Sequence, residues 1–348
     1  MKYMRRRAFV ELAGLGALAT AVSGFRENAW SANTGVPTSA LDFMTSAQRD
    51  NVLAGVGADV GPNVQQAINE AHSSKRGLVF PAGVYRIKDP LRFESSFMRV
   101  RGEGQAIIHQ VGANGPIIKI GHHDPNMRTE ALSFENLVLK GHVTKQTATT
   151  NALEMRWTHR STFTDIRIID CGESAFLLDR VVSNEFRNLK CSNNVDPEFG
   201  LRPKYGIRII GNSTSNVFVN PVMEAPITNT AIFLEDGDLN LFSGGCVEGV
   251  PCGVAIPTAS MNNTFVNFDF EQNTACDIVI QGGSNTTFTG CWASSTASDC
   301  VLINGGASGT TFIGGRYRKM FLGNSTNTKF FGAKIEQGIV GSGKYAEY

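Results

Sequence analysis

The chain has 348 residues, 42% of them hydrophobic and 18% charged, so it is long enough to bury a large core. Its 32 Lys and Arg residues nearly balance its 31 Asp and Glu residues, and the formal net charge of +1 excludes the basic surface of a general nucleic-acid binder. Glycine (37) and phenylalanine (22) are abundant, and this composition favours short strands and turns over helices.

Residues 1–31 have the features of an export signal. Arg5–Arg7 precede Phe9 and Leu12, and a mildly apolar stretch continues to about Val22. This pattern resembles a bacterial twin-arginine (Tat) signal, which implies a periplasmic or secreted protein; a basic tail without a targeting role is the alternative. A membrane span needs about 20 strongly apolar residues, so we expect none here or later in the chain.

The next segments are a linker over residues 32–56 and then a single helix. Asn63–His72 carries Val64, Ala67, Ile68 and Ala71 at helical spacing, with Asn63 as the expected N-cap. Gly77–Ile87 then reads as strand, turn and strand, and Phe97–Gly102 as a further strand. We expect the helix to cover the N-terminal end of the strand-rich part of the chain.

From about residue 130 the sequence repeats. The repeated unit is a Phe, often preceded by Thr and often followed two positions later by Asn or Gly. Five of the eight intervals between these residues are 23 or 24 residues long. The repeat consists of Phe134, Phe163, Phe186, Phe218, Phe242, Phe265, Phe288, Phe312 and Phe330.

A second apolar run, such as Ile207–Ile210 or Ile278–Ile280, lies between successive repeat Phe residues, so each unit contains at least two short strands. Such a unit cannot bury its apolar face alone, but coils stacked about 4.8 Å apart can. The repeat therefore predicts an all-β, single-stranded parallel β-helix of about ten coils over residues 57–348, with the phenylalanines stacked inside. The two longest intervals predict loops at His142–Asn151 and Asn193–Lys204. A propeller blade of about 40 residues is too long for this period.

Two motifs carry a family resemblance. Gly57–Ala71 is a helix rich in Ala, Ile and Gln, and Gly77–Ile87 contains Phe-Pro-x-Gly-x-Tyr. This opening resembles that of the pectate-lyase-like right-handed β-helix superfamily, and Met44–Gln48 is similar to the lead-in of phage tailspike-type depolymerases. The resemblance implies a right-handed coil and a carbohydrate substrate. It leaves the reaction open, because the superfamily includes lyases, hydrolases, epimerases, fructan-transforming enzymes and tailspikes.

The catalytic signatures of two subfamilies are missing. The polygalacturonase-type Asp-Asp pair and Gly-His-Gly are absent, and so is the pectate-lyase Arg-x-Pro-x-x-Arg element. No catalytic residue is therefore carried over by motif.

Strand alternation shows which side chains leave the coil. If each repeat Phe points inward, the residues three and five positions later are again inward, and they are mostly apolar, such as Leu137 and Leu139. Residues four and six positions later then point outward and form a polar stripe, the outward stripe. Its members are Val138, Lys140, Arg167, Ile169, Lys190, Ser192, Val222, Glu224, Cys246, Glu248, Asp269, Glu271, Trp292, Ser294, Arg316, Arg318, Lys334 and Glu336.

The middle of the outward stripe is acidic. Glu224, Glu248 and Glu271 occupy one column on three successive coils, and Asp269 lies two residues before Glu271. Carboxylates about 4.8 to 6.7 Å apart repel each other, so the pKa of at least one should be raised. Glycoside cleavage requires a protonated acid beside an ionised carboxylate. We therefore expect Glu248, Asp269 and Glu271 to be catalytic and Glu224 to contribute to substrate binding.

The flanks of this acidic centre suit glycan binding. Trp292 could stack on a sugar face, and Arg167, Lys190, Arg316 and Arg318 could hold acidic groups of the glycan. The stripe could equally be ordinary solvated surface, a calcium site or a contact within a homotrimer, and these alternatives remain open.

The remaining candidates are weaker. No Cys-x-x-Cys pair supports a zinc site, so we expect no cofactor, with calcium as an option that lacks a motif. Cys252 and Cys276 are 24 residues apart, about one coil, so they could be neighbours, and a disulfide is allowed in an exported protein. His122–Asp124, Arg156–Arg160 and Asp236–Asp238 are more simply read as polar turns.

Three functions follow from these observations. The leading hypothesis is an exported carbohydrate-active enzyme that cleaves a polysaccharide by carboxylate acid–base chemistry. The second is a polysaccharide lyase acting on a uronic-acid polymer, with Lys190, Arg167 or Arg316 serving as base or neutralising cation. The third is a glycan-binding β-helix without catalysis. The expected partner is a polysaccharide or oligosaccharide, not nucleic acid, and a homotrimer is an open option.

Overall fold

The computed structural model describes residues 35–112, 115–122, 124, 126–141, 151–192, 202–224, 227–257, 260–296 and 300–348. The predicted signal peptide and most of the two predicted loops lie outside these residues. Met1–Val36 and Pro37–Tyr348 form separate units, and the second carries all of the structure described below.

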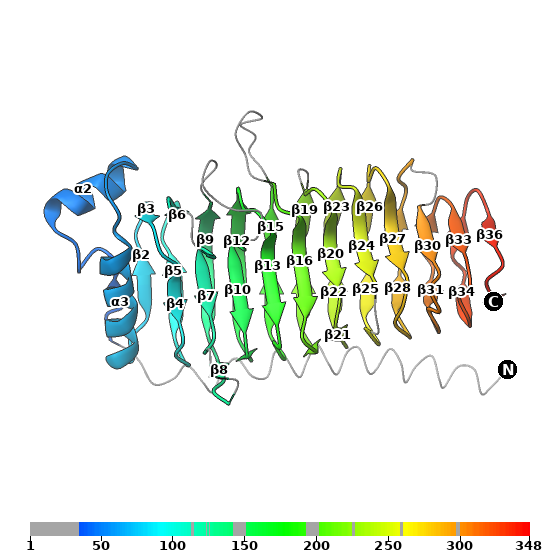
Figure 1. Cartoon of the computed structure of the whole chain (residues 1–348), viewed down its shortest axis with the longest axis horizontal. Helices are drawn as coiled ribbons and strands as arrows, with labels where there is room; N and C mark the ends of the chain where they lie inside the picture. The colour runs from blue at the N-terminus through cyan, green and yellow to red at the C-terminus, as the bar shows by residue number, and fades with distance from the viewer. Residues whose placement is uncertain are drawn as a thin grey trace. The chain divides into compact units, whose positions relative to one another are not determined.

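The unit Pro37–Tyr348 is a stack of parallel coils that follow one another in chain order (Figure 1). In the described residues each coil contributes strands to three facets. The ladder facet consists of β2 (Leu78–Phe80), β5 (Arg99–Gly102), β14 (Glu185–Arg187), β18 (Val217–Val219), β22 (Leu241–Ser243), β25 (Thr264–Val266), β28 (Thr287–Thr289), β31 (Thr311–Ile313), β34 (Thr328–Phe331) and β37 (Tyr345–Glu347). The stripe facet consists of β3 (Gly83–Ile87), β6 (Ala106–Gln110), β15 (Lys190–Cys191), β19 (Val222–Glu224), β23 (Cys246–Glu248), β26 (Asp269–Glu271), β29 (Trp292–Ala293), β32 (Arg316–Tyr317) and β35 (Lys334–Ile335), while β9 (Ser133–Lys140) and β12 (Thr162–Ile169) run through both facets.

The third facet is an eleven-stranded parallel sheet. It consists of β4 (Leu91–Phe93), β7 (Ile118–Ile120), β10 (Leu153–Arg156), β13 (Ser174–Asp179), β16 (Tyr205–Ile210), β20 (Thr230–Leu234), β24 (Cys252–Ile256), β27 (Cys276–Ile280), β30 (Val301–Ile303), β33 (Met320–Leu322) and β36 (Ile339–Gly341). Short pairs form at the turns between β8 (Thr129–Glu130) and β11 (Thr158–His159), and between β17 (Ser213–Thr214) and β21 (Gly237–Asp238). The predicted parallel β-helix is confirmed.

The predicted phenylalanine ladder is also confirmed. Phe134 to Phe330 lie in register on successive coils, and neighbouring rings stack with centroids between 4.5 Å (Phe218 to Phe242) and 5.3 Å (Phe312 to Phe330) apart. All are at most 3% exposed. The rings fill the coil interior and exclude water from it.

The residue two positions after each repeat Phe, which is Asn or Gly except at Asp165, forms the corner between the ladder and stripe facets. Asn220, Asn267 and Gly290 have φ of 50°, 49° and 64°. Glycine and asparagine adopt this left-handed conformation at the lowest cost, which explains the motif. The corner takes up one residue, so the inward positions are three and five residues after the Phe rather than two and four.

The sequence reasoning missed a second internal ladder of polar residues. Asn184, Asn216, Asn240 and Asn263 lie two positions before a repeat Phe, and all are at most 1% exposed. The first three side-chain amides each donate to the next along the stack, as in Asn216 Nδ2 to Asn240 Oδ1 at 3.0 Å, whereas Asn263 Nδ2 donates to Gly237 O at 2.7 Å. Each of the four Oδ1 atoms accepts a backbone N–H from the preceding coil. This ladder satisfies the backbone at the turns into the ladder facet.

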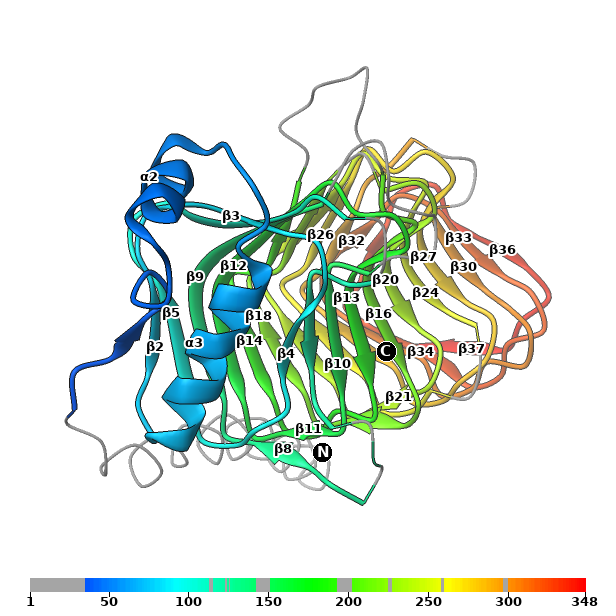
Figure 2. The same cartoon turned by 60° about the vertical axis from the view of Figure 1, so that its left-hand side comes forward.

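The capping helix is present as α3 (Gly61–Ser73), which lies across the N-terminal opening of the coils (Figure 2). Its N-cap is Val60, so the expected N-cap at Asn63 is wrong. Asn63 instead joins two elements, because its Nδ2 donates to Phe43 O at 2.6 Å and its Oδ1 accepts from Gln48 at 3.1 Å.

The segment predicted as a linker contains two further elements. β1 (Thr38–Ser39) pairs with β2, and α2 (Ser46–Ala54) begins at a capping box formed by Thr45 and Gln48. The capping box is a local helix signal that the linker interpretation overlooked.

Candidate functional site

The outward stripe lies on the stripe facet in the predicted register, except that Ser192, which was expected to point outward, is buried. One column runs through Arg167, Lys190, Val222, Cys246, Asp269, Trp292 and Arg316. The other runs through Glu224, Glu248 and Glu271. Arg318 follows two residues after Arg316, beyond β32. The structure therefore brings Glu248, Asp269 and Glu271 together as a carboxylate cluster on two neighbouring coils.

Asp269 is the perturbed member of the carboxylate cluster. Its pKa is raised from 3.8 to about 6, first because burial disfavours the charged form, and then because of the charge of Glu271 and a hydrogen bond with it. Weaker contributions come from Asp277 and Glu248. Asp269 Oδ1 is buried and has no hydrogen-bond partner among the described residues. This carboxyl group is thus half protonated near pH 6, as a general acid requires.

A buried polar group underlies the carboxylate cluster, and the sequence reasoning did not find it. Asp277 is 0% exposed and accepts hydrogen bonds from Asn273 Nδ2 (2.7 Å), from Ser295 N (3.0 Å), from Ser295 Oγ and from Cys300 Sγ (3.2 Å). Burial raises its pKa.

These contacts tie together the turns that follow the strands of the cluster. Asn273 Oδ1 also accepts from Val250 N at 3.2 Å, and Asn273 N donates to Ser295 Oγ at 2.8 Å. Val250, Asn273 and Ser295 lie two residues after the ends of β23, β26 and β29, the strands that carry Glu248, Glu271 and Trp292. Asp277 therefore fixes the ends of three neighbouring site strands.

The predicted binding residues on the N-terminal side of the cluster differ in how they are engaged. Lys190 Nζ lies 3.5 Å from Glu224 Oε1, so Glu224 is paired with a cation, whereas Glu248 and Glu271 have no such pair within the part of the chain that the structure describes. Arg167 lies one coil earlier, and its Nε is buried without a hydrogen-bond partner among the described residues. The two cations therefore differ, since Lys190 is held by Glu224 whereas the Nε of Arg167 is covered by the protein.

On the C-terminal side, Trp292 is 44% exposed and pairs in register with Asp269. The Arg316 guanidinium lies 5.7 Å from the Trp292 ring centroid and forms an ion pair with Glu336. An exposed aromatic face held beside the raised-pKa carboxyl group suits stacking against a sugar ring.

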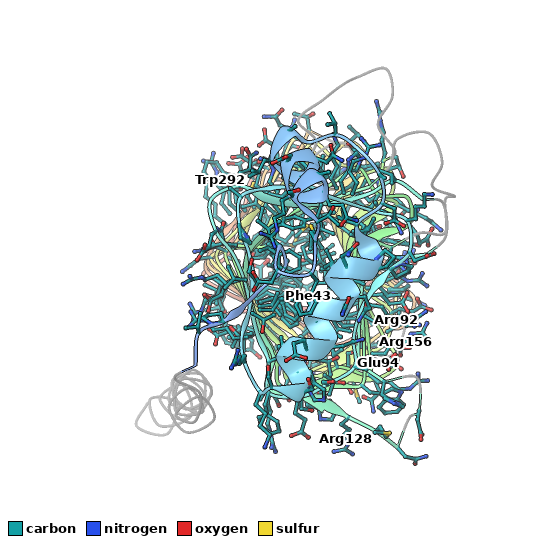
Figure 3. The ribbon with its side chains drawn as sticks, turned by 90° about the vertical axis from the view of Figure 1, so that its left-hand side faces the viewer. Phe43, Arg92, Glu94, Arg128, Arg156 and Trp292 are labelled. Carbon is teal, nitrogen blue, oxygen red and sulfur yellow. The ribbon has the colours of Figure 1, made fainter. Side chains whose placement is uncertain are left out.

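A second polar cluster lies on the third facet and was missed by the sequence reasoning. Glu154 and Asp179 are 7% and 6% exposed, and Arg156 Nε lies 3.1 Å from Glu154 and 3.6 Å from Asp179. Lys119 approaches Glu154 at 3.9 Å, and Asn151 donates to it at 3.3 Å. Figure 3 shows Arg156 and Trp292 on opposite sides of the coil. The sequence did contain a signal for this cluster. Lys119 lies between Ile118 and Ile120, and Glu154 lies between Leu153 and Met155, so each is a charged residue inside an apolar run.

Two of the three weaker motifs make local turn contacts, and the third does not. Asp236 accepts Asn212 N at 2.8 Å, and Asp238 accepts Met261 N at 2.6 Å. Asp124 N donates to His122 Nδ1 at 3.0 Å, while His123 lies outside the described residues. Arg156 belongs to the third-facet cluster instead of to a turn with His159, whose pKa is lowered by burial and by Arg128.

Within the described ranges, no group of three or more His, Cys, Asp or Glu side chains is arranged to hold a metal ion. In the same residues no helix is long and apolar enough to cross a membrane. A cavity of about 330 Å³ lies between α3 and β4, and no residue of the outward stripe lines it. An extended glycan fits an open stripe along the coils better than this cavity at the capped end.

Comparison with known proteins agrees with the fold. A family model described as a right handed beta helix region matches residues 162–316. The A-module of the mannuronan C-5 epimerase AlgE6 of Azotobacter vinelandii is similar, with a TM-score of 0.60, 15% identity, and coverage of 88% of this chain and 99% of that one.

A DFA-IIIase of Arthrobacter chlorophenolicus A6 matches with a TM-score of 0.64 at 11% identity, over 89% of this chain and 93% of that one. The surface adhesin PfbA of Streptococcus pneumoniae matches with a TM-score of 0.59 at 11% identity, over 86% and 91%. No curated protein matches the sequence. At these identities the likenesses show the fold alone, and the predicted right-handed parallel β-helix is confirmed.

Proposed function

We propose that this chain, a right-handed parallel β-helix, is an exported carbohydrate-active enzyme that cleaves glycosidic bonds of a polysaccharide at the carboxylate cluster. The observation that carries the proposal is the placement of Asp269, whose Oδ1 is buried, on the coil next to Glu248 and on the same strand as Glu271, a setting that raises the pKa of Asp269 to about 6. Two carboxyl groups held in different protonation states are what glycoside cleavage uses.

In this proposal Asp269 is the general acid. Its raised pKa keeps it partly protonated near neutral pH, so it donates a proton to the departing glycosidic oxygen. Glu248, on the preceding coil, supplies the second carboxylate, which acts on the opposite side of the bond. Glu271 lies next to Asp269 and keeps the pKa of Asp269 raised.

The outward stripe holds the glycan along the stack of coils. Trp292 stacks on a sugar one coil from Asp269. Arg167 and Lys190 on one side, and Arg316 and Arg318 on the other, bind acidic groups of the chain. Lys190 lies three coils from Asp269, about 14 Å at about 4.8 Å per coil, so binding extends over several sugar units.

The fold comparisons support a carbohydrate substrate. Two of the similar structures, the mannuronan C-5 epimerase module and the DFA-IIIase, bear names of carbohydrate enzymes. The surface adhesin PfbA has the same fold, so a glycan-binding β-helix without catalysis remains an alternative function. A lyase reaction is the second candidate, favoured by Arg167, a cation on the same column as Asp269 that could neutralise the carboxylate of a uronic acid.

A panel of neutral and uronic-acid polysaccharides separates these functions. New reducing ends without ultraviolet absorbance indicate hydrolysis, which the proposal expects. Reducing ends together with absorbance of an unsaturated product indicate a lyase. Binding without new reducing ends on any polysaccharide would overturn both enzymatic proposals.

Variants then test the location of the site. Asp269→Asn and Glu248→Gln should each lower kcat by at least about 100-fold, since each removes one member of an acid–base pair. Glu154→Gln is the matched control on the third facet and should retain activity. Loss of activity in Glu154→Gln with full activity in Asp269→Asn would move the site to the other face.

A further inference from the structure

Two cysteines lie side by side on the outside of the coil. Cys252 of β24 and Cys276 of β27 are register partners, and their Sγ atoms are 3.0 Å apart. Both are partly exposed, whereas Cys171 and Cys191, like Cys291 and Cys300, are buried. An oxidant in solution therefore reaches this pair more readily than the buried thiols.

We propose that Cys252 and Cys276 are joined by a disulfide when the protein is in an oxidising compartment. Neighbouring strands of a sheet are about 4.7 to 4.9 Å apart, within the Cα separation of about 4.4 to 6.8 Å that disulfides allow. The bond therefore forms without a shift of the coils. This inference rests on the proposed export of the protein and not on the proposed catalysis.

The chemistry is thiol–disulfide exchange with a small-molecule or protein disulfide as the oxidant. A hydrogen bond joins the two Sγ atoms, and this contact raises the pKa of Cys252 and lowers that of Cys276, so Cys276 is the attacking thiolate. Cys276 attacks the oxidant and releases one of its thiols. Cys252 then loses its proton and attacks Cys276, which releases the second thiol. Two protein thiols are oxidised and one oxidant disulfide is reduced to two thiols.

The cross-link would join the two coils that carry the carboxylate cluster. Cys252 lies four residues after Glu248, and Cys276 lies five residues after Glu271. Cys276 also directly precedes Asp277, the buried acceptor that holds the turns behind the cluster. The disulfide would thus join these coils on their outer surface, while the buried Asp277 joins their turns inside the coil.

The test uses the full chain, incubated either with oxidised glutathione or with dithiothreitol, and then digested without reduction. The expected result is one cross-linked peptide pair that contains Cys252 and Cys276, with five cysteines still open to alkylation after unfolding. A closed loop of this length should raise the Tm of the oxidised protein by about 5 °C over the reduced protein.

Two variants control this experiment. Cys252→Ser should lose both the cross-link and the Tm difference. Cys246→Ser, a partly exposed thiol on the neighbouring β23, should keep both. The proposal is overturned if the oxidised wild-type chain keeps both thiols free, or if the cross-link joins another pair. Peptide mapping of the wild-type chain decides this even if a variant fails to fold.

Discussion

At the scale of single residues, the sequence predicted the carboxylate cluster but not the buried Asp277 and the hydrogen bonds that hold the turns behind the cluster. The +4 and +6 positions after each repeat Phe placed Glu248, Asp269 and Glu271 correctly, because alternation follows from strand geometry. Asp277 was missed because its environment is built from Asn273, Ser295 and Cys300, which reach it only through the packing of separate turns. Sequence alone does not reveal which turns converge.

The charge of Glu271 raises the pKa of Asp269, so Glu271→Gln should lower it by about one unit from its value of about 6. Carbon-13 NMR titration of the Asp269 carboxyl group measures this directly. Glu336→Gln is the control, since Glu336 lies three coils beyond Glu271, about 14 Å away, where salt screens its charge. An unchanged pKa of Asp269 in Glu271→Gln would contradict this electrostatic account.

The same pKa sets two pH dependences. Asp269 binds its proton more tightly in the folded than in the unfolded chain, so its stabilising contribution is present below pH 3.8 and is lost as the pH rises to about 6. As the general acid, it should make kcat/KM fall about tenfold per pH unit above about 6. A pH–rate profile that stays flat from pH 6 to 8 would exclude Asp269 as the acid.

Replacing the buried acceptor should be costly. Asp277→Asn places an amide N–H₂ against the donors of Ser295 and Cys300, and we expect it to lower the free energy of unfolding by about 2 kcal/mol. Urea unfolding measures the change. Asp50→Asn on the exposed face of α2 is the matched control and should have no effect. Equal stability of the two variants would show that Asp277 does not hold the turns.

At the scale of elements, the phenylalanine repeat predicted the strands, and the capping helix was recognised from its apolar spacing. The corner between the facets was visible only as an unexplained Asn or Gly, and its left-handed backbone gives the motif its physical reason. The asparagine ladder was equally periodic in the sequence. It was missed because a buried polar column becomes plausible only once each amide is seen to bond the next.

The corner offers a clean comparison at one position. Asn267 has φ of 49° and is exposed, so Asn267→Gly should leave stability nearly unchanged. Asn267→Val places a β-branched side chain in the left-handed region and should cost about 1 to 2 kcal/mol. Thermal or urea unfolding of both variants checks this. A Val variant as stable as the Gly variant would mean that the corner does not require its residue type.

At the scale of the whole molecule, the coils and their order followed from the sequence, while the second polar cluster did not. Glu154, Asp179 and Lys119 belong to three different coils, and the packing of the third facet brings them to Arg156. The sequence left a homotrimer as an open option, and light scattering of the full chain would test it.

The proposed cleavage uses only the side chains of the protein and needs no metal ion. The sequence had left a calcium ion as an option. Polysaccharide cleavage should therefore keep its rate after dialysis against EDTA, and added calcium should not raise it. Loss of activity with EDTA and recovery with calcium would replace the acid–base proposal with one in which the carboxylates hold a cation.

The central claim is that a glycan is bound and cleaved across the carboxylate cluster. The most direct test is a crystal structure of the Asp269→Asn variant soaked with an oligosaccharide of the polysaccharide identified in the panel. We predict a sugar ring against Trp292, with its glycosidic oxygen within hydrogen-bonding distance of residue 269. An oligosaccharide bound instead over Glu154 and Asp179 on the third facet would contradict the account.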